Sequence, residues 1–247
     1  MGLRLLPLPV PAVWCVTIFL PPMRLSLIAI GVVGLTTSIF AATEPAASVS
    51  PYAAASSDSG TVPSVTPSVS EREAVRELAR RAERELRGNI LPFWLKHSRD
   101  RERGGFYGQI ESDMKVRESA PRGALLTARI LWTFSAVQRQ FNDPDYAVMA
   151  RWAFADLQRR FWDTEEGGVF WTVKANGKPL DTRKQIYAQA FAIYACSEYS
   201  RASGDKEALA RAVELFRLIE KYAYDKEQGG YFEAFDRDWM PLPKEAR

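Results

Sequence analysis

Hydrophobic residues recur at helical spacing in five segments of the chain. The three- and four-residue steps that mark an α-helix occur in Val69–Leu86, Ala120–Phe141, Tyr146–Phe161, Thr182–Ala202 and Lys206–Tyr222. The first, third and fifth segments carry one polar face rich in Arg and Glu, which is typical of surface helices. The second and fourth are apolar around most of their circumference, which predicts burial. The pattern therefore predicts outer helices alternating with inner ones.

A glycine-containing sequence motif occurs three times, twice between these helices and once after the last of them. It reads DRERGGFY at Asp100–Tyr107, DTEEGGVF at Asp163–Phe170 and DKEQGGYF at Asp225–Phe232, so that the aspartates are 63 and then 62 residues apart. A fixed period of this length indicates a repeat architecture. We interpret the carboxylates as turn residues, because they recur in every unit.

Short strands are expected after each Gly-Gly pair. Aromatic residues alternate there, and glycine permits the preceding turn; the predicted strands are Phe106–Glu111, Val169–Lys174 and Tyr231–Phe235. Ahead of the first phrase, Gly88-Asn89 is expected to end the first helix, with a short continuation at Leu91–Leu95 as the alternative.

The predicted fold class is all-α. Alternating outer and inner helices, with short β-hairpins in the loops, describe an (α/α)6 barrel, a toroid of about six helical hairpins. Residues 69–247 hold less than half of such a ring, so we expect an incomplete barrel. An unclosed ring exposes apolar helix faces, and the chain is therefore expected to self-associate.

The N-terminal third has a different character. Residues 43–68 are rich in Ser, Pro, Ala and Thr and predict a disordered linker. Residues 1–42 form a leader, in which Met23–Ala41 has the basic start, apolar run and small terminal residue of a secretory signal. Five prolines interrupt residues 1–22, which we interpret as an over-called extension upstream of the true translation start at Met23. Export to the periplasm or the extracellular space is expected, without stable membrane association after cleavage; an uncleaved anchor is the alternative.

Composition narrows the chemistry further. The net charge of +3 comes from intermixed acidic and basic residues, which argues against a nucleic-acid partner. The two cysteines, Cys15 and Cys196, leave no internal disulfide after loss of the leader. The sequence contains no phosphate-binding glycine motif and no Cys/His cluster, so no cofactor or metal is expected.

Three side chains are candidates for a functional site. His97, the single histidine, is interpreted as a solvated or capping residue, with a proton shuttle as the alternative. Arg129 interrupts an apolar helix, where a guanidinium requires either a structural carboxylate or a polar cavity. Tyr187 offers its phenol to a sugar hydroxyl or, alternatively, packs in the core.

Several motifs together resemble those of the N-acylglucosamine 2-epimerase family, with the cellobiose 2-epimerases as the nearer branch. The resemblance covers roughly Glu71 to Trp239 and is carried by an ordered run of motifs: Gly104–Gly108 (GGFYG), Ala128–Ser135 (ARILWTFS), Phe161–Asp163 (FWD), Gly167–Trp171 (GGVFW), Lys184–Tyr194 (KQIYAQAFAIY) and Gly229–Phe235 (GGYFEAF). It implies an (α/α)6 barrel and inversion at C2 of the reducing-end glucose of a cellobiose-like disaccharide, without metal or nucleotide.

The resemblance also assigns roles to residues. Arg129 matches the active-site arginine of the family, and Tyr187 matches an inner-helix tyrosine near the sugar. Two bases, for which histidine is well suited near neutral pH, exchange the C2 proton through an enediolate. The family's catalytic histidines would follow Trp239, and His97 occupies none of their positions. We therefore expect this chain to be an inactive piece of a sugar 2-epimerase.

Two other functions compete with this one. The first is an exported, non-catalytic helical-repeat module whose concave face binds a glycan or a protein. The second is a fragment of an (α/α)-toroid glycoside hydrolase, which requires a pair of acidic residues in its cavity.

Overall fold

The structure, a computed structural model, describes residues 68–242. These residues fall into two units, 68–84 and 85–242, and each is described by itself. The expected leader and signal segment, the linker up to residue 67 and residues 243–247 lie outside the described residues.

The first unit consists of most of helix α1 (Val69–Glu85). Ser68, expected to close the linker, caps this helix: its Oγ accepts the N–H of Glu71 at 3.2 Å, and the Ser68 N–H donates to Glu71 Oε2 at 2.7 Å. This reciprocal pair is a capping box. No residue of α1 is buried, and its expected place in an outer ring stays a prediction.

The chain remains helical across Gly88-Asn89, so the expectation that these residues end the helix is wrong. A π-helical turn, η1 (Leu86–Ile90), leads directly into α2 (Leu91–His97). Glycine commonly ends a helix by adopting a left-handed conformation, and Gly88 does not adopt a positive φ. Leu91 is fully buried and anchors the continuation, which runs two residues beyond the expected Leu95.

The four remaining helices agree with the periodicity. They are α3 (Ala124–Phe141), α4 (Pro144–Asp156) with the π-turn η2 (Leu157–Phe161), α5 (Ile186–Ser203) and α6 (Lys206–Tyr222). Helices α3 and α5 each begin four residues later than expected, because short strands occupy the preceding positions.

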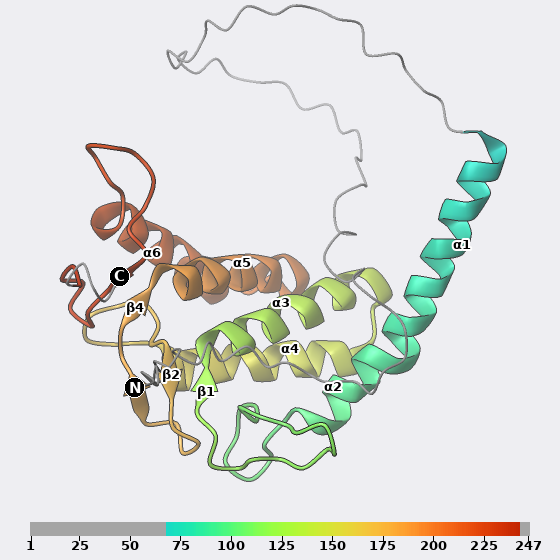
Figure 1. Cartoon of the computed structure of the whole chain (residues 1–247), viewed down its shortest axis with the longest axis horizontal. Coiled ribbons are helices and arrows are strands. Elements are labelled where there is room, and N and C mark those ends of the chain that lie inside the picture. The colour runs from blue at the N-terminus through green and yellow to red at the C-terminus, as the bar shows by residue number, and fades with distance from the viewer. Residues whose placement is uncertain (1–67, 243–247) are drawn as a thin grey trace, which may run out of the picture. The chain divides into compact units, whose positions relative to one another are not determined.

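Helices α3 and α5 pack against each other, α4 packs against α3, and α6 packs against α5 (Figure 1). The expected alternation of inner and outer helices is confirmed for α3 to α6. The main core lies between these layers and includes the fully buried Ala128, Leu131, Met149, Leu157, Ala192, Cys196 and Leu215.

The strands are shorter than expected. They are β1 (Arg122–Gly123), β2 (Thr172–Val173), β3 (Pro179–Asp181), β4 (Lys184–Gln185) and β5 (Ala234–Phe235), arranged in the antiparallel sheets β1-β2-β3 and β4-β5. The segment Phe106–Glu111 forms only single bridges, Arg99↔Phe106 and Ile110↔Val116.

Two of the strand pairings join consecutive repeat units. β1, immediately before α3, pairs with β2, which follows the next glycine loop, and β4, immediately before α5, pairs with β5. The same junctions cap the inner helices: the N–H of Ala124 donates to the Trp171 carbonyl at 3.1 Å, and that of Ile186 to the Glu233 carbonyl at 2.9 Å. Each glycine loop therefore fixes the start of the inner helix before it.

Within residues 68–242, no helix is both long and apolar enough to cross a membrane.

Candidate functional site

A partly exposed aromatic face runs along the inner helices α3 and α5, with Trp132 and Phe191 half-buried against the core. Trp132 of α3 stacks on Tyr194 of α5, with ring centres 4.9 Å apart and planes 13° apart. Phe191 contacts Tyr194 edge-on at 6.5 Å, and Tyr187 contacts Phe191 edge-on at 4.9 Å. Tyr187 and Tyr194 are more than half exposed. Aromatic faces of this kind suit the apolar faces of sugar rings and also protein contacts.

Arg129 lies one helical turn before Trp132 and is exposed. The expected burial within the apolar run is wrong, because Ala128, Ile130 and Leu131 are buried while the intervening position faces outward. Within residues 68–242, Arg129 forms no ion pair or hydrogen bond, so the structural-carboxylate alternative is also wrong there. Its five N–H donors are free to bind an oxygen-rich ligand.

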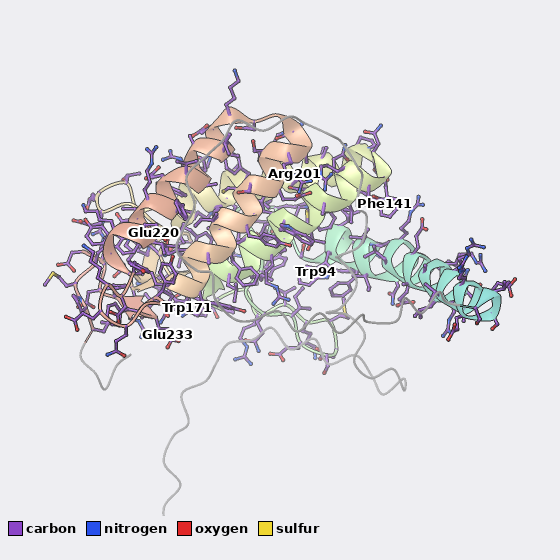
Figure 2. The ribbon with its side chains drawn as sticks, turned by 90° about the horizontal axis from the view of Figure 1, so that it is seen from above. Trp94, Phe141, Trp171, Arg201, Glu220 and Glu233 are labelled. Atoms are coloured by element: carbon purple, nitrogen blue, oxygen red, sulfur yellow. The ribbon has the colours of Figure 1, made fainter. Side chains whose placement is uncertain are left out.

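Tyr187 lies in the first turn of α5 and is 56% exposed, so the core-tyrosine alternative is wrong. The inner helices run in the same direction (Figure 2). Helix α3 begins at the strand junction near Trp171 and ends at Phe141, and α5 begins at the junction near Glu233 and ends near Arg201. Arg129 precedes Trp132 by one turn, and Tyr187 precedes Tyr194 by two turns. Both candidates therefore lie on the aromatic face, towards the start of the inner helices, although no hydrogen bond joins them.

The loop aspartates act as turn residues, as expected. Asp100 Oδ1 accepts the backbone N–H groups two and three residues later at 3.0 and 2.9 Å, and Asp163 and Asp225 do the same in their loops. Two of them also form buried ion pairs that the sequence analysis missed. Arg122 binds Asp100 at 2.5 Å, and Lys184 binds Asp163 at 2.8 Å. These carboxylates are fully engaged in structure, which removes them as the acid pair of a hydrolase.

The second of these ion pairs has an additional cation. Arg237 donates to both carboxylate oxygens of Asp163, at 2.8 and 2.9 Å. Burial alone raises the pKa of Asp163, but the hydrogen bonds from Arg237 and Lys184 outweigh it and hold that pKa well below its usual range. Lys184 is the second residue before Ile186, so this cluster fixes the start of α5, where Tyr187 lies.

Asp156, a buried carboxylate of α4, has a raised pKa, opposite to that of Asp163. Burial raises the pKa of Asp156 to about 6, although Arg160 and a hydrogen bond from Thr127 lower it. Asp156 lies against Gly105 and accepts the hydrogen bond of the Thr127 hydroxyl from α3. It supports the first glycine loop and is not part of the aromatic face.

His97 lies in the last turn of α2, where its ring is 5.4 Å from that of Phe93. The structure places it beside neither Arg129 nor Tyr187. Among residues 68–242, no group of three or more His, Cys, Asp and Glu side chains could hold a metal ion.

Trp132, Phe191 and Tyr194 were missed as site residues by the sequence analysis. Their signal was present: Tyr187, Phe191 and Tyr194 follow a four-plus-three spacing that puts all three on one face of a helix. The pairing with Trp132 depends on how α5 docks on α3, which the spacing does not show.

Comparison with known proteins agrees with this arrangement. The model of the family N-acylglucosamine 2-epimerase (GlcNAc 2-epimerase) matches residues 105–246, more than half of the chain. The chain is 47% identical to the cellobiose 2-epimerase of Bacteroides fragilis over 165 residues, which cover 67% of this chain and 42% of that protein. It is 45% identical to that of Ruminococcus albus over 162 residues, covering 66% and 41%.

The structure is similar to the solved cellobiose 2-epimerase of Spirochaeta thermophila, with a TM-score of 0.68 and 41% identity over 71% of this chain and 44% of that one. The helical architecture is thus related to that of the (α/α)6 barrels. The chain spans less than half the length of these relatives. With the glycine loops, the paired helices and the matched region in agreement, this chain belongs to the N-acylglucosamine 2-epimerase family.

Proposed function

We propose that the aromatic face of α3 and α5 binds the reducing-end sugar of a cellobiose-type disaccharide as part of a carbohydrate 2-epimerase site. The main support is Arg129, an exposed guanidinium with no ion pair within residues 68–242, on the same face as Tyr187 and the stacked pair Trp132–Tyr194. The relatives named cellobiose 2-epimerase supply the class of substrate.

The proposed reaction inverts C2 through an enediolate. After ring opening, a base removes the C2 proton; the C–H electron pair forms the C1–C2 double bond, and negative charge develops on the C1 oxygen. A second base returns a proton to the opposite face of C2. A fixed cation near the C1 oxygen stabilises the developing charge, and this is the role we give Arg129. Tyr187 hydrogen-bonds a sugar hydroxyl and helps to hold C2 between the two bases.

Within residues 68–242, no histidine lies on the aromatic face. The sequence contains a single histidine, His97, and its ring packs beside Phe93 on α2. We therefore propose that the chain by itself holds an incomplete barrel, binds the sugar weakly and does not epimerise it.

Ligand binding tests the proposal directly. Cellobiose is titrated into the 247-residue chain while intrinsic tryptophan fluorescence is recorded, since Trp132 lies in the proposed site. Arg129→Ala and Tyr187→Phe are expected to weaken binding about tenfold or more, because each removes a polar contact with the sugar. Arg201 is an exposed arginine at the other end of α5, and Arg201→Ala is the control for Arg129→Ala. Tyr224→Phe, at another exposed tyrosine, is the control for Tyr187→Phe.

Three results would each contradict part of this proposal. Equal binding by Arg129→Ala and Arg201→Ala would remove Arg129 from the site. Conversion of cellobiose to its C2 epimer by the isolated chain, measured by chromatography at the rate of a complete relative, would contradict its inactivity. Retained binding of a glycan or protein in a site that does not need Arg129 would favour the non-catalytic module.

A further inference from the structure

The first glycine loop (Asp100–Tyr107) packs on a buried polar cluster that contains unpartnered atoms. The cluster consists of Arg122 of β1, Asp156 of α4 and Arg160 of η2, whose side chains are 3%, 3% and 16% exposed. Within residues 68–242, Arg122 Nε, Asp156 Oδ1 and Arg160 Nη1 are buried and have no hydrogen-bond partner. Buried polar atoms are nearly always hydrogen-bonded, to protein or to ordered water, so each of these three atoms requires an explanation.

The three side chains lie close together. Arg160 Nε is 3.1 Å from Asp156 Oδ1, although the two groups are not aligned as a hydrogen bond, and Arg160 Nη2 donates to the Arg103 carbonyl. Burial raises the pKa of the Asp156 carboxyl, and the charges of Arg160 and Arg122 lower it, so both guanidinium groups lie near that carboxyl. The carboxyl itself lies against Gly105 of the loop.

The neighbouring atoms of the cluster already have partners. Arg122 Nη1 donates to the Gly104 carbonyl and Arg122 Nη2 to Asp100 Oδ2, both at 2.5 Å. Asp156 Oδ2 accepts the Thr127 hydroxyl at 3.3 Å. These contacts fix the orientation of both side chains, so Arg122 Nε and Asp156 Oδ1 cannot turn to other protein groups without breaking them.

The second glycine loop (Asp163–Phe170) makes the same contact without unpartnered atoms. The period of 62 residues aligns three positions of the two repeats: Arg122 with Lys184, Thr127 with Gln189, and Asp156 with Leu218. The buried Gln189 amide accepts the Val169 N–H at 2.8 Å and donates to the Val169 carbonyl at 2.7 Å. Lys184 Nζ donates to an aspartate and to a loop carbonyl, at 2.8 and 2.7 Å. All the polar groups aligned with the cluster are therefore satisfied in this repeat.

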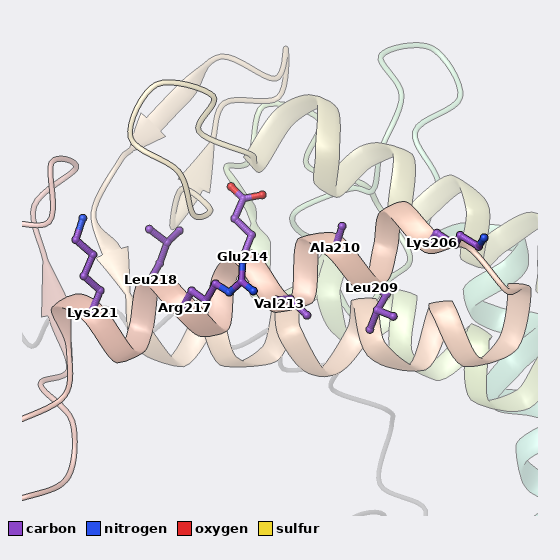
Figure 3. Close-up of a pocket in the computed structure, with 8 residues that line it drawn as sticks. All are labelled: Lys206, Leu209, Ala210, Val213, Glu214, Arg217, Leu218 and Lys221. Atoms are coloured by element: carbon purple, nitrogen blue, oxygen red, sulfur yellow. The ribbon is translucent and has the colours of Figure 1, made fainter.

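An apolar side chain takes the place of the carboxylate in the second repeat. Leu218 of α6 points towards the second glycine loop, where a Cβ built on Gly167 would lie 3.0 Å from it (Figure 3). In the first repeat, Thr127 is too short to reach the loop backbone as Gln189 does, and its hydroxyl donates to Asp156 instead. The first repeat thus has a carboxylate where the second has Leu218, and it lacks the amide that completes the hydrogen bonds of the second loop.

The unpartnered atoms select a ligand by their chemistry. Two of them are guanidinium nitrogens, which only donate, and one is a carboxylate oxygen, which only accepts. An anion would be repelled by Asp156 and a cation by the two arginines, whereas a water molecule can accept two hydrogen bonds and donate one here. Buried waters typically make about three hydrogen bonds to groups that otherwise lack partners. Because all three atoms are buried, the ligand is also small.

We propose that this cluster holds one buried water molecule, which accepts hydrogen bonds from Arg122 Nε and Arg160 Nη1 and donates one to Asp156 Oδ1. The water joins the strand before α3, the end of α4 and the first glycine loop, as the Gln189 amide joins α5 to the second loop. This site is structural, and its existence does not depend on the proposed sugar chemistry.

Oxygen-17 magnetic relaxation dispersion tests the site, because it detects water molecules that stay inside a folded protein much longer than surface water does. The full 247-residue chain is compared with Asp156→Leu, which introduces the residue of the second repeat, and with Asp156→Asn, which keeps an acceptor. Asp156→Leu is expected to lose the contribution of one internal water, and Asp156→Asn is expected to keep it. Glu118→Gln, at an exposed carboxylate paired with Arg103, is the control for the change in charge and should also keep it.

The outcome separates this site from other internal waters. Equal dispersion amplitudes for Asp156→Leu and Asp156→Asn would overturn the proposal. If Asp156→Leu fails to fold, a crystal structure of the unsubstituted chain that shows ordered water decides. Density for a water within hydrogen-bond distance of Arg122 Nε and Asp156 Oδ1 would support the site, whereas a direct hydrogen bond between these two atoms, or an ion between them, would overturn it.

Discussion

Replacing Arg122 with methionine is expected to destabilise the protein more than any surface charge change in the same loop. Arg122 binds Asp100 at 2.5 Å, and the two side chains are 3% and 0% exposed. The guanidinium also donates to the Gly104 carbonyl at 2.5 Å. Methionine fills much of the volume but leaves the Asp100 carboxylate buried without its main cation.

The expected magnitude follows from burial. Removing one member of a buried ion pair costs about 3–5 kcal/mol, whereas an exposed pair contributes about 0–1 kcal/mol. Arg103 provides the matched control, because it reaches the same carboxylate at 3.6 Å with a side chain that is 39% exposed. Arg103→Met is therefore expected to cost less than about 1 kcal/mol. Against a total stability of about 5–15 kcal/mol, the two variants should be clearly distinct.

Urea unfolding followed by circular dichroism measures both variants. The double variant Asp100→Asn/Arg122→Met should recover part of the loss, because it no longer buries an unpaired charge. If Arg122→Met and Arg103→Met lower the free energy of unfolding equally, or if the double variant is additive, the ion pair does not stabilise the loop as argued.

Three further outcomes follow from single sites. Burial raises the pKa of Asp156 to about 6 in the folded protein, so its contribution to stability is full below its unfolded pKa of about 4 and is lost as the pH rises through about 6. Asp156→Asn should therefore reduce the fall in the free energy of unfolding between about pH 4.5 and 7.5. An unchanged fall would exclude this residue as its source. Gly230→Ala should lower the free energy of unfolding by about 1–2 kcal/mol from its positive φ alone. Gly168→Ala should cost ~1–3 kcal/mol beyond that backbone cost, because its Cβ would lie 2.8 Å from the Trp239 ring. Equal melting temperatures of the two variants would contradict this packing. The Cys196 thiol, whose pKa burial raises to about 12, should react with a thiol reagent only on unfolding, as read by peptide mass spectrometry; labelling of the native protein would refute its burial.

Local patterns in the amino-acid sequence were enough to predict that these helices exist, that α3 to α6 alternate between inner and outer positions, and the period of the repeat. Apolar spacing placed α6 at its observed bounds, Lys206–Tyr222, because an amphipathic helix is a local pattern. The recurring Asp and Gly-Gly positions likewise fixed the three turns, since a left-handed backbone and an aspartate cap depend on neighbours within a few residues. The motifs were also sufficient to indicate the family.

Which side chains meet depends on how the elements pack together. Arg129 lies in an apolar run and was expected to be buried, but the docking of α3 against α4 and α5 leaves that one position outward. The pairs Asp100–Arg122, Asp163–Lys184 and Trp132–Tyr194 join residues 21 to 62 positions apart, and no local periodicity encodes such contacts. Only packing between units shows that two loops are covered and paired while the third, at Asp225, presents its carboxylate and glycines uncovered by any described residue.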